Sequence, residues 1–327
     1  MTGPQDRSHG PDAGSGYYGH PVVKAPVWKP AIALYFFTGG VAGASSTLAL
    51  AAGLTDNRRL ARSALVASAA GIAVSGPLLV ADLGRPARFL NMLRVAKPSS
   101  PMSVGSWILS AFAPASMLAA VCDVTGRLPR LGRAAAAVAG ALGPAVATYT
   151  AVLVADTAIP AWHDAYRELP LVFAGSAATS AAGAALAFTP VADAGPARRL
   201  AVIGAVLDVG AFRAMEHRLG EVSGPYENGR AGRLARAAEA CLAAGAMLVP
   251  AAGRRRSAAV AAGALLCTGS LLTRFSVFRA GFESAADPAA TIRPQRRRME
   301  GTERPPVTTP TPGSTRARPT SESTVDP

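Results

Sequence analysis

The sequence predicts an all-α integral membrane protein, a bundle of about eight transmembrane helices followed by a disordered C-terminal tail. Half of the 327 residues are hydrophobic and only 16% are charged, whereas a soluble domain is about a quarter charged. The mean hydropathy is +0.26 although the chain contains 33 Lys and Arg residues, so the apolar residues must lie in long blocks. Such blocks exclude a soluble protein with a single core and a largely disordered chain.

Eight apolar segments are candidates for membrane-spanning helices, which need about 20 residues to cross the hydrocarbon core. The segments are rich in Gly and Ala, and small residues allow helices to pack closely in a membrane. Three segments are weaker than the rest; one of them contains Asp208 and ends near Arg213, and another is short and carries Glu239. We therefore expect eight spans, with seven as the alternative count. The five clear segments are 31–54, 64–83, 105–122, 134–155 and 169–189, and the weaker ones are 200–214, 235–250 and 257–273.

The chain divides into three parts around these spans. Residues 1–27 form an N-terminal arm, whose start lacks the apolar core of a cleaved signal peptide. Residues 28–283 form the transmembrane domain. Residues 284–327 are rich in Ser, Thr, Pro and Arg, cannot bury much apolar area, and are expected to be disordered. No internal repeat is visible at a fixed period, although a weak inverted repeat stays open.

Eight spans put both termini on one face of the membrane, here called the N-side, which also holds the loops 84–104, 156–168 and 215–234. The opposite face has four short connections with few acids. Short cytoplasmic loops are enriched in Lys and Arg, so this pattern favours a multi-pass protein of the cell (plasma) membrane with extracytoplasmic termini. Because the net charge of +13 gathers beside apolar blocks, it does not indicate a nucleic-acid partner. The basic residues of the opposite face are Arg58, Arg59, Arg62, Arg127, Arg130, Arg133, Arg198, Arg199, Arg254, Arg255 and Arg256, and its acids are Asp56, Asp123 and Asp193.

A few polar residues within or beside the spans could carry chemistry. Tyr149 lies inside the fourth span, Asp156 at its end and Asp208 inside the sixth. An ionisable group in a membrane span is costly and indicates function by default, although Asp208 is also compatible with a span that ends early. Asp82 and Arg85 are three residues apart, so a helix end would place them on one face, where they could simply form a surface ion pair. Aromatic residues near the span ends also fit an interfacial belt.

The sequence gives no sign of a resident metal or haem. Its four histidines are His9, His20, His163 and His217, and none lies in the middle of an apolar segment, whereas a haem held by two histidines inside a bundle needs them to project inward from facing helices. The three cysteines form no CxxC pair, so no iron–sulfur cluster is expected in this chain. No phosphate-binding loop, dinucleotide fingerprint or HExxH motif is present.

The chain resembles the NrfD / polysulfide-reductase family of quinone-interacting membrane subunits. The resemblance rests on WKPAIALYFFTGGVAGAS at 28–45, DLGRP at 82–86 with RFLNM at 88–92, SPMSVGSW at 100–107, and YTAVLVADTAIPAW at 149–162 followed by LPLVFAGS at 169–176. It covers roughly residues 17–280 and is looser in the second half. The resemblance implies an eight-helix subunit without metals that exchanges electrons with menaquinone or ubiquinone. It also implies an iron–sulfur partner subunit that serves a molybdopterin or tungstopterin catalytic subunit.

In this family the quinone pocket uses the arm before the first helix and a tyrosine of the fourth helix, which points to His20 and Tyr149. Asp82 and Arg85 carry over as motif residues. A quinone headgroup needs a donor at each carbonyl and a route for protons, so Tyr149 and His20 could donate while Asp82 or Asp156 passes protons. The chain would contain no complete catalytic cycle of its own. A transporter with a polar site at the midplane and a purely structural anchor remain the alternatives.

Overall fold

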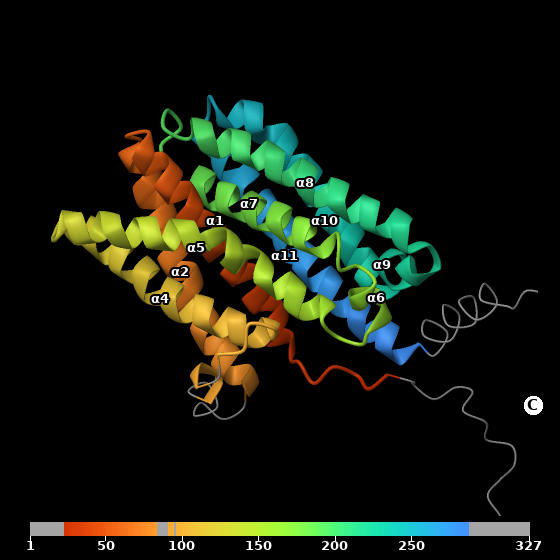
Figure 1. Cartoon of the computed structure of the whole chain (residues 1–327). Coiled ribbons are helices and arrows are strands. Elements are labelled where there is room, and N and C mark those ends of the chain that lie inside the picture. The colour runs from red at the N-terminus through yellow and green to blue at the C-terminus, as the bar shows by residue number, and fades with distance from the viewer. Residues whose placement is uncertain (1–22, 84–90, 95, 288–327) are drawn as a thin grey trace, which may run out of the picture.

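The computed structural model describes residues 23–83, 91–94 and 96–287, and this part of the chain is built from helices (Figure 1). Eight of the helices are long and lie side by side as a bundle. Short helices occupy two of the N-side connections. The long helices are α1 (Pro30–Leu54), α2 (Arg58–Leu83), α4 (Pro101–Thr125), α5 (Pro129–Ala155), α7 (Leu169–Phe188), α8 (Gly195–Leu219), α10 (Gly229–Ala252) and α11 (Arg256–Ala286); the short ones are α6 (Pro160–His163), η1 (Gly220–Ser223) and α9 (Gly224–Glu227).

The eight predicted spans correspond one to one to these long helices. Seven of the helices in the described residues are long and apolar enough to cross a membrane. The eighth, α8, falls short in hydropathy because it carries Asp208, Arg213 and Glu216 among other charged residues. It nevertheless packs closely along α7, since a Cβ atom on Gly175 of α7 would lie 2.4 Å from the backbone nitrogen of Asp208. The all-α membrane bundle is therefore confirmed, with α8 as its most polar member.

Local sequence explains where several helices begin. Proline occupies the first turn of α1, α4 and α5, where its fixed φ suits a helix and its missing N–H is not needed. In α4 the side chain of Ser100 also accepts a bond from the backbone N–H of Ser103 at 3.5 Å, which is an N-cap. The Ser100-Pro101 pair of the SPMSVGSW motif is thus the start signal of this helix.

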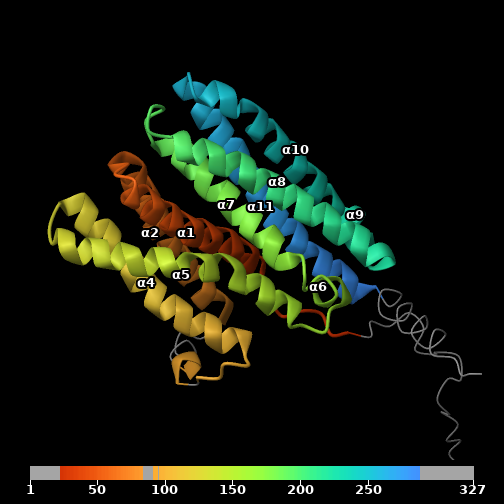
Figure 2. The ribbon, with the colours of Figure 1, turned by 45° about the horizontal axis from the view of Figure 1, so that its top comes forward.

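The long helices form two halves of four, visible as the orange-to-yellow and green-to-blue groups in Figure 2. In the first half α1 packs against α2 and α5, and α4 packs against α5. In the second half α7 packs against α8 and α11, and α10 packs against α11 in the same way. Both halves start from the N-side. The fold therefore repeats a four-helix unit in the same orientation, which no fixed sequence period revealed.

A pair of glycines marks the equivalent helix crossing in each half. In the first half a Cβ on Gly43 would lie 2.5 Å from the carbonyl oxygen of Gly143, and a Cβ on Gly143 would lie 2.3 Å from that of Gly43. In the second half the corresponding distances between Gly183 and Gly263 are 2.7 and 2.5 Å. No side chain fits at such separations, so the glycines let the backbones touch, as small residues do in membrane bundles.

The last helix is longer than predicted. The final apolar segment was expected to end at Thr273, but α11 continues to Ala286. The apolar segment is therefore only part of the helix, which runs on through Arg274. The apolar residues Phe275, Val277 and Phe278 follow it, and Arg274 itself is completely buried within the bundle.

Candidate functional site

The N-side end of the bundle is held together by two tryptophans. Trp28, just before α1, stacks on Trp162 of α6 with ring centroids 5.5 Å apart. The indole N–H of Trp162 donates to the carbonyl of Val277 in α11 at 2.7 Å. A Cβ on Gly281 would lie 1.9 Å from the Trp162 ring, so only a glycine at this position leaves room for the ring. Trp162 is therefore a fully buried core residue and not a member of an interfacial belt, whereas Trp107 is 48% exposed and fits one.

Asp82 joins the end of α2 to the start of α1. Its Oδ1 accepts a hydrogen bond from the backbone N–H of Lys29 at 2.9 Å, one residue before α1 begins. The carboxylate thereby accepts a hydrogen bond from a backbone N–H that has no acceptor within helix α1. Asp82 is partly exposed, so it also has contact with the N-side surroundings. Arg85, the other predicted motif residue, lies outside the described residues, and its ion pair with Asp82 stays a prediction.

Tyr149 lies in α5, six residues before the helix ends at Ala155, which places it roughly 9 Å below the N-side end of that helix. Its ring packs closely against α4 at Gly105, because a Cβ on Gly105 would lie 2.4 Å from the Cε2 atom of Tyr149. The side chain is half-buried and packs against an apolar cluster that includes residues of both halves. No hydrogen bond from another described residue reaches its hydroxyl group. The glycine of the SPMSVGSW motif thus creates the space for this tyrosine.

The remaining predicted residues of the first half do not converge on Tyr149. Asp156 is exposed at the C-terminal end of α5, and the described residues contain no hydrogen bond from its carboxylate to Tyr149 or Asp82. His163 nearby places its Nδ1 atom 3.1 Å from the carbonyl of Ala155. His20, the second predicted quinone ligand, lies outside the described residues.

Asp208 belongs to the second half of the bundle and is 1% exposed. Its only hydrogen bond from a described side chain is a long one, 3.4 Å from Thr273 Oγ1 to Oδ2. The helix itself does not end at Asp208, since α8 continues for three turns to Leu219. Asp208 is thus a buried acid inside a membrane helix, remote in the fold from Tyr149 because α7 and α11 lie between α8 and α5.

Sequence reasoning missed Arg274, the basic residue buried near Asp208. Its Nε donates to Ser176 Oγ at 3.1 Å and its Nη2 to the carbonyl of Phe173 at 2.7 Å. The guanidinium carbon lies 3.8 Å from the centre of the Phe173 ring, a cation–π contact. Gly40 of α1 leaves room for it, since a Cβ there would lie 3.0 Å from Nη2. The apolar residues that follow Arg274 in the sequence were the signal that the helix does not end there.

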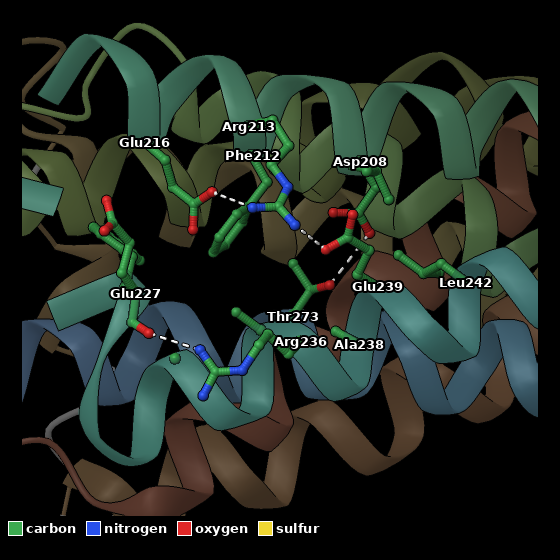
Figure 3. Close-up of a pocket in the computed structure, with 14 residues that line it drawn as sticks. Asp208, Phe212, Arg213, Glu216, Glu227, Arg236, Ala238, Glu239, Leu242 and Thr273 are labelled. Carbon is green, nitrogen blue, oxygen red and sulfur yellow. Dashed lines mark hydrogen bonds and ion pairs between the residues drawn. The ribbon is translucent and has the colours of Figure 1, made fainter. Parts of the chain in front are cut away.

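Several charged side chains lie between the second half of α8 and the first half of α10 (Figure 3). Arg213 bridges Glu216 of its own helix, at 3.1 Å, and Glu239 of α10. These residues line a cavity together with Asp208 and Thr273. Among the described residues, no group of three or more His, Cys, Asp or Glu side chains could hold a metal ion. The cluster is a charged recess beside the buried Asp208.

Comparison with known proteins identifies the family to which the chain belongs. The family model "Polysulphide reductase, NrfD" matches residues 21–201, which is more than half of the chain and runs from the arm before α1 to the first turns of α8. No curated protein matches the chain. The matched part contains Asp82, Gly105 and Tyr149, whereas Asp208 and Arg274 lie beyond it. The chain belongs to the polysulphide reductase NrfD family, whose members are the membrane subunits of quinone-interacting oxidoreductase complexes.

Proposed function

We propose that the chain is the quinone-reactive subunit of such a complex, exchanging electrons between membrane menaquinone or ubiquinone and an iron–sulfur partner subunit. That partner would in turn serve a molybdopterin or tungstopterin catalytic subunit. The observation that carries the proposal is Tyr149, which the family model covers and which offers a hydroxyl group unused by the described residues. The chain itself holds no complete catalytic cycle, because the proposal places every redox centre in its partners.

The quinone headgroup would lie beside Tyr149, between the N-side ends of α1, α4 and α5. Tyr149 would donate its hydroxyl proton in a hydrogen bond to one carbonyl oxygen, and His20 of the arm would donate to the other. A half-buried aromatic ring against an apolar cluster suits a quinone ring and its tail. Full reduction of a quinone takes up two electrons and two protons, so the site needs a route for protons as well as a partner for electrons.

Asp82 and Asp156 are the proposed proton carriers of this half. Both lie at the N-side end of a long helix and both are accessible to some degree, so each can exchange protons with the surrounding water. Asp82 also anchors the arm through Lys29, which would keep the arm residue His20 near the bundle. Arg85 follows three residues later in the sequence and is the proposed ion-pair partner of Asp82.

The distribution of buried charges supports this proposal over a transporter. A transporter built from two matched halves would place charged or broken positions at corresponding places in both. Within the described residues, the buried charged side chains are Asp208 and Arg274, both in the second half, while the buried polar residues of the first half are Ser and Thr. This unequal distribution of buried charges indicates that the two halves have different functions.

The arginine-rich face opposite the N-side supports an orientation with the termini outside the cytoplasm. Two of its arginines form ion pairs, Arg59 with Asp193 at 3.2 Å and Arg62 with Asp123 at 2.8 Å. These exposed pairs connect neighbouring loops but leave most of the face positive. Under the positive-inside rule this face is cytoplasmic, and the electron-transfer partner docks on the N-side.

The test is purification of the tagged chain from native membranes in a mild detergent, followed by metal analysis. Iron together with molybdenum or tungsten in the purified complex would support the proposal, and the identity of the catalytic subunit would name its substrate. A single metal-free chain, under conditions that keep a known respiratory complex of the same membranes intact, would contradict it.

A further inference from the structure

The second half of the bundle contains a cavity of about 130 Å³. It lies between α8 and α10, with α9 at one end and α11 behind it (Figure 3). A water molecule in a cavity needs polar partners and about one probe sphere of space, so this volume holds several. The residues that line it are Asp208, Val209, Phe212, Arg213, Glu216, Tyr226, Glu227, Gly232, Ala235, Arg236, Ala238, Glu239, Leu242 and Thr273.

The lining carries an excess of negative charge. Four acidic residues face two arginines in this list. Arg213 is engaged by two of the acids, Glu216 and Glu239, while Arg236 donates to the backbone carbonyl of Glu227 at 2.8 Å and not to a carboxylate. Neighbouring charges of one sign in a recess with low-dielectric walls attract small ions of the opposite sign. The cavity therefore favours cations over anions.

The cavity runs inward from the N-side. Glu227 and Arg236 are exposed near the N-side ends of α9 and α10, whereas Asp208 is 1% exposed and lies eleven residues before the end of α8, about 16 Å along the helix axis. Oδ1 of Asp208 accepts no hydrogen bond from a described side chain. A buried carboxylate that lacks such a partner and lines a polar cavity needs water or a cation to satisfy it.

Arg274 does not line the cavity but lies beyond its inner end, against α7 and α1. It follows Thr273 on α11, and its guanidinium group is fixed by Ser176 and by the carbonyl and ring of Phe173. A fixed buried positive charge repels cations. A cation that reaches Asp208 therefore meets a barrier if it moves further toward α1 and α7.

We propose that this cavity is a water-filled inlet through which protons and other small cations reach Asp208 from the N-side, with Arg274 beyond its inner end. The inlet belongs to the second half of the bundle and does not depend on the quinone site proposed for the first half. Asp208 exchanges its proton with the N-side solution through it.

The experiment measures how fast thiols placed in the cavity react with small charged reagents. In the full-length chain, with Cys122, Cys241 and Cys267 replaced by Ala, Thr273→Cys places a thiol at the inner end and Val209→Cys places one on α8. The control is Ser276→Cys, which is nearer to the N-side end of α11 and fully buried but does not line the cavity. Each variant is treated with 2-aminoethyl methanethiosulfonate, a cation, and with the 2-sulfonatoethyl reagent, an anion of similar size.

We expect both cavity thiols to react with the cation about tenfold faster than with the anion, and Ser276→Cys to react with neither. Adding Glu239→Gln should reduce the preference for the cation, because it removes one of the acids. Cavity thiols that react no faster than Ser276→Cys would overturn the inlet, and equal rates with both reagents would overturn its cation preference. Val209→Cys decides the question if Thr273→Cys does not yield a monodisperse protein. The labelling rates are independent of quinone turnover, so the inlet and the proposed function can fail separately.

Discussion

Replacement of Tyr149 by Phe is expected to slow electron exchange with quinone while leaving the protein folded. The hydroxyl group takes part in no hydrogen bond with another described residue, so its removal breaks no hydrogen bond among them, and the ring that packs against Gly105 stays in place. If the hydroxyl donates to a quinone carbonyl, its loss removes one hydrogen bond, about 1–1.5 kcal/mol. Since about 1.4 kcal/mol corresponds to a factor of ten, we expect a five- to tenfold fall in kcat/KM for the quinone.

The assay follows electron exchange between the purified native complex and a soluble quinol analogue, with subunit composition measured on the same sample. A second variant, Gly105→Ala, tests the geometry. The added methyl group would lie 2.4 Å from the Tyr149 ring, so the ring must move and turnover should fall although the hydroxyl is still present. Unchanged turnover in Tyr149→Phe would refute the role as a donor. Loss of the partner subunits in that variant would make Tyr149 a structural residue.

Three further predictions concern the packing of the bundle. Arg274→Met should lower the free energy of unfolding, measured in mixed detergent micelles, by about 3–5 kcal/mol. The double variant with Asp208→Asn should lose less free energy than the sum of the two single variants. Additive losses would show that the two groups are not coupled. Gly143→Ala should destabilise the protein by about 1–3 kcal/mol, because the methyl group would lie 2.3 Å from a carbonyl oxygen of α1. The control Gly76→Ala, with nothing within 4 Å, should not destabilise it. Equal effects of the two changes in a thermal melt would contradict the close contact of α1 and α5 at Gly143. Asp82→Ala should cost about 1 kcal/mol, as loss of a helix cap does, and should speed proteolysis of the arm before α1; an unchanged cleavage rate would mean that the bond to Lys29 does not hold the arm.

Sequence reasoning alone could predict the number and type of the elements. Hydropathy over about 20 residues reports directly whether a segment can lie in a bilayer, so each of the eight predicted segments is a helix in the structure. Prolines and the Ser100 cap explain the starts of α1, α4 and α5 because these signals act within one helical turn. The motifs DLGRP and SPMSVGSW led to the family assignment for the same reason, since they are local strings of residues.

The candidate site was only partly predictable. Tyr149 and Asp82 were selected from the sequence as candidate site residues, but their contacts, with Gly105 and Lys29 respectively, join segments that are far apart in the chain. The apolar segment ends at Thr273, before Arg274, whereas α11 continues to Ala286. In the bundle, Ser176, Phe173 and the nearby Asp208 compensate the charge of Arg274.

The sequence by itself thus determined that this is a multi-span membrane protein of the NrfD type, because composition and local motifs act on one segment at a time. Only the tertiary structure decided that two four-helix units repeat, that Gly43 meets Gly143 as Gly183 meets Gly263, and that Asp208 ends a charged cavity. These features depend on which helix faces of distant segments meet. That choice is made by packing between helices, where a single methyl group or an unpaired charge changes the free energy by several kcal/mol.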